Sequence, residues 1–407
     1  MYYFFNDVPL ELINSSSKEG DVNILIGENG SGKSQLLSQL ASRYIRNHKK
    51  VIAIANSVYD KFPRAGNGLY LLRDRGGRKR VRTSVKNALI NISPEDFTRL
   101  KNAAEALRFV GYEPLIGVKN ISVSVDQLEF ALIERNTKMQ TSDSDEEFLE
   151  LIPNEGIEEL KALLYKLQSF QQEKIIWLSF NDFSFHEVDK VTFIQLLKWE
   201  RLLKRLKLVN SIDLYLRREN SEIPLYDASS GELSFISSLI YIATLIDENS
   251  AILVDEPENS LHPRWQKDYV KVLLSLFSYY QPKIVIATHS AVVVTGAEVF
   301  NPSTQVFKSK NFQFFKKDSD PINIEEAFYG YFDVITPQNR FLSKHLIDLL
   351  NRLAEGEETL DTITQKLAKI ENDIYQPSQT NLIYGVREIA QKIINKPNNN
   401  NESTPLN

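Results

Sequence analysis

The pattern of apolar and polar positions in the first part of the chain predicts an α/β fold. Residues 22–26 (Val-Asn-Ile-Leu-Ile) form a short apolar run that ends in a glycine, which is typical of a buried parallel strand. Residues 33–47 carry leucines at helical spacing, so we expect a helix there. A second apolar run at 51–55 predicts another strand. A strand, a glycine-rich loop, a helix and a strand in this order begin many α/β domains.

The same alternation returns in the second half of the chain. Residues 251–254 and 283–287 are apolar and short enough for buried strands, and stretches with helical spacing lie beside them. A charged, strand-like piece at 306–317 precedes three amphipathic helices, whose apolar sides indicate core packing or a surface for a subunit or an effector. The other elements expected here are a strand within 208–216 and helices at 231–247, 265–279, 340–355, 358–375 and 380–395.

Residues 57–222, between these two parts, differ in character. A basic loop at 64–86 carries eight Lys or Arg residues and one Asp. An acidic segment at 141–150 is typical of a solvated linker. The rest has mostly helical periodicity, with helices expected at 94–109, 125–135, 156–173 and 191–206.

These patterns predict a discontinuous α/β head with two additions. Residues 1–56 and 223–310 would form the head, a mostly parallel sheet with flanking helices. A largely helical insertion would occupy 57–222, and a C-terminal helical region would occupy 311–395. Residues 396–407, with an asparagine run and two prolines, are predicted to be a disordered tail.

Composition narrows the chemistry that this fold can support. The 407 residues are 42% apolar and 25% charged, which is ordinary for a soluble globular protein. The absence of cysteine excludes disulfides, thiolate nucleophiles and Cys-ligated metals. With 48 Lys and Arg against 53 Asp and Glu, any contact with nucleic acid must come from a local patch. The chain shows neither a signal peptide nor an apolar run of about 20 residues, so we expect a cytoplasmic protein that does not enter the membrane.

A phosphate-binding loop stands between the first strand and the first helix. Residues 27–34 match the pattern G-x-x-x-x-G-K-[ST] at each fixed position. Glycines let several backbone N–H groups point at one anion, next to a helix N-terminus that favours negative charge. Lys33 would bridge the β- and γ-phosphates of ATP, and the Ser34 hydroxyl would bind Mg²⁺. The predicted nucleotide-binding residues are Gly27, Glu28, Asn29, Gly30, Ser31, Gly32, Lys33, Ser34 and Gln35.

Two adjacent acids complete the predicted chemistry. Asp255 and Glu256 end the apolar run that starts at Ala251, and ligands of open α/β sheets bind at the carboxyl ends of strands. Asp255 would hold Mg²⁺, directly or through water. Glu256 would polarise the attacking water, as a general base or as a positioning group.

Two further motifs lie at fixed distances from Asp255. Ser229-Ser230-Gly231-Glu232 opens a predicted helix, with Gly231 24 residues before Asp255. His289 follows the next apolar run, 34 residues after Asp255. A serine-capped helix start and a histidine after a strand are each common structural features on their own. Their order relative to the phosphate loop and the acids is what indicates a shared site.

With these motifs the sequence resembles the ABC-type ATPase superfamily of P-loop NTPases. Ser229, Ser230 and Gly231 match its signature loop, with Glu232 in place of the familiar Gln, while residues 258–263 match its D-loop and His289 its switch histidine. The resemblance implies that the signature loop of one subunit completes the ATP site of a facing subunit. It therefore implies at least a head-to-tail dimer that sandwiches two ATP molecules.

The sequence at 255–263 resembles the SMC-like branch found in prokaryotic anti-phage defence. It reads Asp-Glu-Pro-Glu-Asn-Ser-Leu-His-Pro and is followed by Thr-His-Ser at 288–290. That branch includes ATPases of the OLD, Septu and PARIS systems. We find no fused nuclease pattern, so the resemblance implies a separate effector, such as a nuclease. One departure is that Asn56 and Ser57 stand where a transporter ATPase has a glutamine-bearing loop.

The leading hypothesis is an ATP-hydrolysing switch that controls such an effector in anti-phage defence. A DNA-repair ATPase that acts directly on DNA is the alternative if the basic stretch from Arg64 to Lys86 contacts phosphates rather than solvent. A transporter subunit and an ATP-dependent scaffold with negligible hydrolysis are two further hypotheses.

Overall fold

The computed structural model describes the chain over twelve stretches. Among its described helices, none is both long enough and apolar enough to cross a membrane. The acidic segment at 141–150 and the predicted tail at 396–407 lie outside the described residues. The described stretches are 8–14, 21–57, 59–73, 77–91, 97–139, 154–169, 175–180, 187–310, 312–317, 324–332, 340–372 and 377–394.

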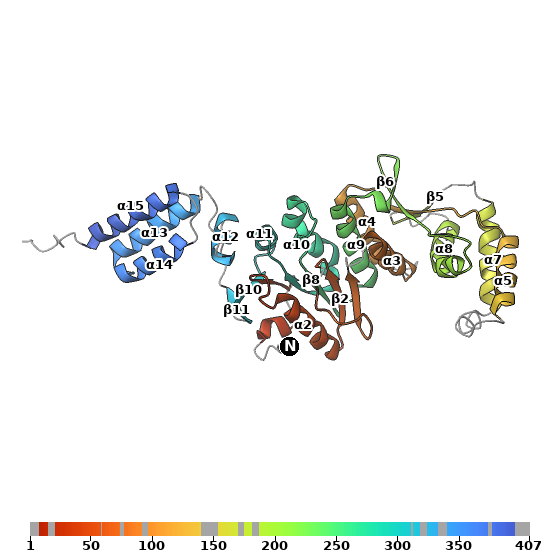
Figure 1. The fold of residues 1–407 in the computed structure, drawn as a ribbon, viewed down its shortest axis with the longest axis horizontal. Helices are drawn as coiled ribbons and strands as arrows, with labels where there is room; N and C mark the ends of the chain where they lie inside the picture. The colour runs from red at the N-terminus through yellow and green to blue at the C-terminus, as the bar shows by residue number, and fades with distance from the viewer. Residues whose placement is uncertain are drawn as a thin grey trace, which may run out of the picture.

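A seven-stranded sheet forms the centre of the head, in the order β11-β10-β1-β9-β8-β2-β3 (Figure 1). All neighbouring strands are parallel except β10 and β11, which form an antiparallel hairpin at one edge. The predicted α/β class is confirmed. The strands are β1 (Val22–Ile26), β2 (Lys50–Ala55), β3 (Leu69–Arg73), β8 (Ser250–Asp255), β9 (Lys283–Ala287), β10 (Gln305–Lys310) and β11 (Gln313–Lys317).

Helices cover both faces of this sheet, which is why its inner strands are apolar at nearly every position. Alternate residues of β1 point to opposite faces: Leu25 packs with α2 (Lys33–Arg46), and Ile24 lies in the core on the other side. That second core contains residues of α9 (Ser230–Leu245) and α10 (Pro263–Phe277). The predicted strands at 22–26 and 283–287 have the expected bounds.

The prediction of a basic loop at 64–86 is wrong. Residues 69–73 form β3, which pairs with β2, and Gly77–Ile90 form the helix α3. Apolar residues between the charges explain this, because Leu72, Val85 and Leu89 are buried in the core. The many charged residues in this segment made the apolar patterns of an edge strand and an amphipathic helix hard to recognise.

The insertion also contains an antiparallel sheet that the helical prediction missed. Its order is β5-β4-β6-β7, and the strand predicted within 208–216 begins only at Leu214. The bounds are β4 (Leu115–Lys119), β5 (Ile175–Ser179), β6 (Leu214–Arg218) and β7 (Ser221–Pro224), with the helices α4 (Phe97–Val110), α5 (Val125–Met139), α7 (Asn154–Gln168) and α8 (Glu187–Arg205).

Three C-terminal helices pack around a core of their own, which includes Leu346, Ile363 and Ile383. Figure 1 shows this bundle to one side of the sheet. The sheet itself takes in β3 and β11, so it extends past the predicted boundaries at 57 and 310. The remaining helices are α1 (Leu10–Ile13), α11 (Ala291–Phe300), α12 (Ile324–Phe332), α13 (Arg340–Glu355), α14 (Leu360–Asn372) and α15 (Pro377–Ile394), with two short 3₁₀ turns at Leu225–Asp227 and Ser278–Tyr280.

Candidate functional site

The loop between β1 and α2 has the geometry of an anion cradle. Gly30 and Gly32 have φ angles of 79° and 96°, in the left-handed region that favours glycine. Gly27 has a φ angle of 151°, which L side chains rarely adopt, and a Cβ there would lie 3.0 Å from the Ser309 Cβ, so this position also favours glycine. The loop is therefore held in a tight arch at the carboxyl edge of the sheet.

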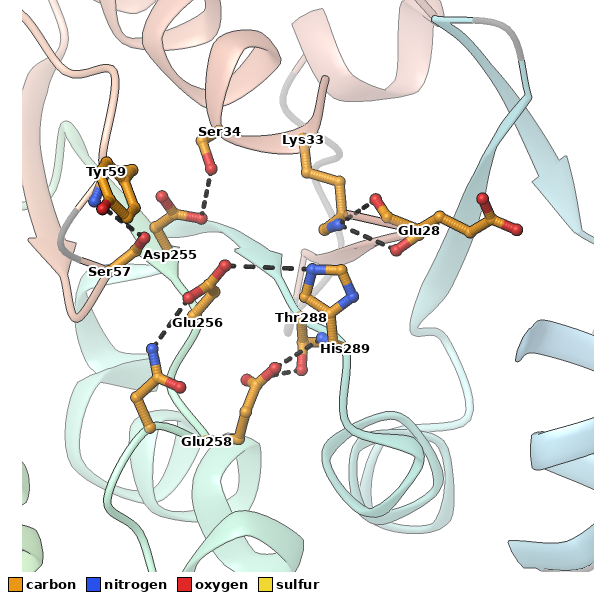
Figure 2. A network of polar contacts seen from close by, with 12 residues as sticks. Glu28, Lys33, Ser34, Ser57, Tyr59, Asp255, Glu256, Glu258, Thr288 and His289 are labelled. Atoms are coloured by element: carbon orange, nitrogen blue, oxygen red, sulfur yellow. Dashed lines mark hydrogen bonds and ion pairs between the residues drawn. The ribbon is translucent and has the colours of Figure 1, made fainter. Parts of the chain in front are cut away.

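Lys33 lies under this arch and is buried. Its Nζ donates to the carbonyl oxygens of Gly27 and Glu28, at 2.9 and 3.1 Å (Figure 2). Burial lowers the pKa of Lys33 to about 8, although Glu256 and Asp255 oppose this shift by attracting its charge. A phosphate would offer the ammonium group a better partner than two neutral carbonyls.

Asp255, at the end of β8, is fully buried beside the start of α2. Its Oδ1 accepts a hydrogen bond of 3.0 Å from the Ser34 hydroxyl, so two residues 221 positions apart meet as predicted. Its Oδ2 is buried and has no hydrogen-bond partner among the described residues. Burial raises the pKa of Asp255 to about 7.

This pair of oxygen donors fits Mg²⁺. A magnesium ion is commonly held by one or two protein oxygens together with substrate phosphates and waters. The unpartnered Oδ2 of Asp255 and the Ser34 hydroxyl supply that number of protein ligands. Among the described residues, no group of three or more His, Asp or Glu side chains could hold a metal.

Glu256 is held in an unusual backbone conformation beside the phosphate loop. Its φ angle is 54°, and its N–H donates to the Ala287 carbonyl of the neighbouring strand at 2.8 Å. The Oε2 accepts from the Asn259 side chain at 2.9 Å, while Oε1 lies 4.0 Å from the Nε2 of His289. A strained, non-glycine residue at a strand end is typical of functional sites.

The backbone of His289 is held in place by Glu258, which the sequence indicated only as part of the D-loop motif. Glu258 is partly buried and accepts from the His289 N–H at 2.6 Å and from the Thr288 hydroxyl at 2.7 Å (Figure 2). Burial lowers the pKa of His289, and the nearby charge of Lys33 lowers it further. The imidazole is therefore neutral at pH 7. Glu258 is a positioning residue that sequence reasoning gave no role.

The signature segment begins α9. Its contacts explain why a serine stands at 229 and a glycine at 231. Ser229 caps the helix in a capping box, because its Oγ accepts from the Glu232 N–H and the Glu232 carboxylate accepts from the Ser229 N–H. A Cβ on Gly231 would lie 2.4 Å from the Ser260 carbonyl oxygen, so glycine is required there. Glu232 also forms an ion pair of 2.7 Å with Arg218 on β6.

The structure thus brings together Lys33, Ser34, Asp255, Glu256 and His289 at one edge of the sheet. The signature segment makes its contacts with Arg218 and Ser260 instead.

Asn56 and Ser57 follow β2 and lie beside this edge. The Asn56 N–H donates to the Asp255 carbonyl at 3.1 Å, and its own carbonyl accepts from the Asn259 side chain at 3.3 Å. The Ser57 Oγ accepts from the Tyr59 N–H at 3.2 Å. Ser57 therefore lies close to Asp255 (Figure 2), and Asn56 is joined to Asp255 through its backbone.

Several charges of the predicted basic patch are engaged within the fold. Arg73 pairs with Asp60 at 3.1 Å, and Arg82 pairs with Asp213. Lys86 is buried in an ion pair with Glu200, with 2.7 and 2.8 Å between Nζ and the two carboxylate oxygens. The side chains of Arg75, Arg78, Lys79 and Arg80 lie outside the described residues. At least three of the eight cations therefore stabilise the head and the insertion, which weakens the case for contact with nucleic acid.

Comparison with known proteins supports an ATPase. Residues 116–295 match the family described as "AAA domain, putative AbiEii toxin, Type IV TA system". That range includes Asp255, Glu256 and His289, and the phosphate loop at 27–34 precedes it.

Two curated relatives are described as probable ATPases of retrons. The Retron Ec83 probable ATPase of Escherichia coli is 25% identical over 312 residues, which cover 70% of this chain and 54% of that protein. The Retron Vc95 probable ATPase of Vibrio cholerae serotype O1 biovar El Tor is 25% identical over 187 residues, 43% of this chain and 32% of that protein. The chain thus spans about half and about a third of the lengths of these relatives. Together with the fold and the site, the matches indicate the class: part of the chain is similar to an AAA-type ATPase domain and to the probable ATPases of retrons.

Proposed function

We propose that this protein binds ATP with Mg²⁺, hydrolyses it between facing subunits, and uses this cycle to control a separate effector in anti-phage defence. The observation that carries the ATPase part is the meeting of Ser34 with Asp255, whose second oxygen is buried and has no partner in the described part of the chain. A buried carboxylate that the fold leaves half satisfied is costly unless a ligand completes it. A magnesium nucleotide on the adjacent phosphate loop does so.

In this mechanism each residue has a distinct part. The N–H groups of the loop and Lys33 bind the β- and γ-phosphates, and Lys33 gives up its bonds to the Gly27 and Glu28 carbonyls to do so. Ser34 and Asp255 would hold Mg²⁺, which supplies charge neutralisation at the phosphates when it is bound. The Glu256 carboxylate accepts a hydrogen bond from the attacking water and orients it toward the γ-phosphate.

The neutral His289 takes part as a hydrogen-bonding group rather than as a cation. Its Nε2 lies 4.0 Å from the Glu256 carboxylate, close enough for both side chains to contact the same water or phosphate oxygen. Glu258 holds the His289 backbone in place through a hydrogen bond of 2.6 Å. Loss of the γ-phosphate would remove a partner from His289 and so report hydrolysis to α11, which begins directly after it.

The facing subunit is proposed to contribute the start of α9. The Ser229 Oγ accepts the Glu232 N–H within its own chain, and its hydroxyl would turn its proton from the Glu232 carboxylate to a γ-phosphate across the interface. The Gly231 N–H and the positive end of the helix dipole add to this contact. The resemblance to ABC-type ATPases supports a head-to-tail pair with two nucleotides in the interface.

The defence role is supported by the resemblance to anti-phage ATPases and by the similarity to the retron proteins. The C-terminal bundle has its own core, separate from that of the sheet, and is our candidate for the region that meets the effector. A nuclease on a separate chain is the proposed effector.

Hydrolysis and binding measured on variants test the ATPase. We expect Lys33→Ala to lose ATP binding, and Glu256→Gln to bind ATP while turnover falls about 10²- to 10⁴-fold. Light scattering should show that Glu256→Gln with ATP accumulates as a dimer or larger assembly. Glu248→Gln changes an exposed acid and serves as the control. ATP binding that is unchanged in Lys33→Ala would contradict the proposal, and unchanged turnover in Glu256→Gln would refute the role of that residue.

A further inference from the structure

A pocket of about 870 Å³ opens at the carboxyl edge of the sheet, beside the phosphate loop. Its walls are the first half of that loop, the hairpin of β10 and β11, and the end of α12. This volume is ample for a mononucleotide-sized ligand. The phosphate loop lines this pocket and also forms the proposed phosphate site, so the pocket and that site are adjacent.

Lysines and an aromatic ring share the face of the hairpin that lines this pocket. Lys308 on β10 is directly opposite Phe315 on β11, and Val306 is opposite Lys317, so the side chains of these residues point to one face of the sheet. Lys308, Lys310 and Lys317 all line the pocket, whereas Glu28 is the one acid among the described residues that line it. These residues carry a net positive charge, which suits an anionic ligand.

The Phe315 ring is 52% exposed, although the alternate hairpin residue Phe314 is buried in the core. α12 contributes Tyr331 and Phe332 to the lining. The Tyr331 hydroxyl donates to Glu298 on α11, which fixes the end of this helix. An exposed ring and lysines in one pocket are suited to a flat base attached to phosphates.

The strand order shows which part of a nucleotide reaches this pocket. Asp255 ends β8, on one side of β1, while β10 and β11 lie on the other side. Ser34, Asp255 and the loop after β2 already surround the Mg²⁺ side of the phosphate loop. A nucleotide with its terminal phosphates among these residues has open space for its remainder toward the hairpin.

We infer that this pocket binds the nucleoside part of the nucleotide, with a purine base stacked on Phe315 and with Lys308 and Lys310 on the ribose and α-phosphate side. The inference rests on the proposed nucleotide site at the phosphate loop. It adds that the hairpin makes the protein select nucleoside triphosphates over a bare triphosphate.

Binding of Mg²⁺-ATP and of inorganic triphosphate to the full-length chain separates the two parts of the site. We expect Phe315→Ala to weaken ATP binding about 5- to 100-fold, because the base loses its stacking partner, and to leave triphosphate binding unchanged. Phe315→Trp should retain ATP binding, and its fluorescence should be quenched when ATP binds. Phe130→Ala, which removes an exposed ring on α5, should change neither affinity.

A covalent label provides a second readout. A photoreactive ATP with an azide on the purine ring should label the hairpin at 305–317, and excess ATP should prevent this labelling. If Phe315→Ala binds ATP as the wild type does, or if the label falls outside the hairpin and α12, the inference is overturned. Wild-type protein that binds neither ATP nor triphosphate would instead refute the proposed function itself.

Discussion

Two sets of opposite charges are buried in this protein, and they differ in how fully the fold satisfies them. In the insertion, the Lys86 ammonium contacts both oxygens of Glu200, and Glu200 also accepts from Lys204 at 2.6 Å and from the Ile212 N–H at 3.1 Å. At the phosphate loop, Lys33 donates only to backbone carbonyls, and Asp255 keeps one buried oxygen without a partner among the described residues.

The pKa values of the two carboxylates reflect this contrast. Burial alone would raise the pKa of Glu200, but hydrogen bonds from Lys204, Lys86 and Ile212 more than offset it, so the value is lowered. For Asp255 burial dominates, and the pKa rises to about 7. Buried charge with complete partners holds the α3 and α8 helices together, and buried charge with incomplete partners marks the place where a ligand completes the structure.

Removing one partner of the satisfied pair should have the largest effect on stability. We expect Lys86→Met to lower the free energy of unfolding by about 3 kcal/mol, because it leaves Glu200 buried with fewer partners. Urea unfolding measures this change. The double variant Lys86→Met with Glu200→Leu should recover much of the loss, and Arg108→Met, which breaks an exposed pair with Glu105, should cost under about 1 kcal/mol. A Lys86→Met protein as stable as the wild type would remove the contrast between the two sites.

At Asp255, whose hydrogen-bond partners are incomplete, removing the charge should raise the free energy of unfolding rather than lower it. Below pH 4 Asp255 is protonated in both the folded and the unfolded chain; between pH 4 and 7 the unfolded chain loses this proton first, so the folded state is progressively destabilised. We therefore expect Asp255→Asn to raise the free energy of unfolding of the nucleotide-free protein by about 2 kcal/mol at pH 8, and to have little effect near pH 4.

Thermal unfolding at both pH values, with Asp227→Asn as an exposed control, measures this difference. The same Asp255→Asn variant should lose Mg²⁺-dependent hydrolysis. An Asp255→Asn protein that is less stable at pH 8 would show that the carboxylate is satisfied by the fold.

Glu258 lies between these two carboxylates, since it is only partly buried and has two protein donors. We expect Glu258→Gln to lower turnover about tenfold, because the amide accepts only one of the hydrogen bonds from Thr288 and His289 and so displaces His289. ATP affinity should stay unchanged. Thr288→Ser keeps the hydroxyl and should behave as the wild type in both measurements. A loss of ATP affinity equal to the loss of turnover would argue against a positioning role.

The smallest change is expected at the surface ion pair of the signature helix. Glu232→Gln retains an oxygen for the capping box and loses only the charge that attracts Arg218, so the free energy of unfolding should fall by under about 1 kcal/mol. This difference should vanish in about 0.5 M salt, which screens exposed pairs. An effect as large as that of Lys86→Met would show that the link from β6 to α9 supports the fold of the whole head.

Local chemistry explains which features the sequence predicted. A phosphate loop needs particular glycines, a lysine and a serine at consecutive positions, and a strand buried on both faces is visible as an apolar run. The loop at 27–34, the acids after β8 and His289 were therefore predictable one by one. Edge strands and antiparallel strands such as β3 and β4 carry weaker patterns, and charged neighbours hid them.

The sequence by itself determined the phosphate-binding loop, the paired acids and the α/β order of the head, because each depends on neighbouring residues. Only the tertiary structure decided which charges are satisfied. It paired Lys86 with Glu200 across 114 positions and set Lys308 and Phe315 beside the phosphate loop. It also left an oxygen of Asp255 without a partner among the residues that the structure describes. The physical reason is that the free energy of a buried charge depends on the donors, acceptors and solvent around it, and the fold assembles these from distant parts of the chain.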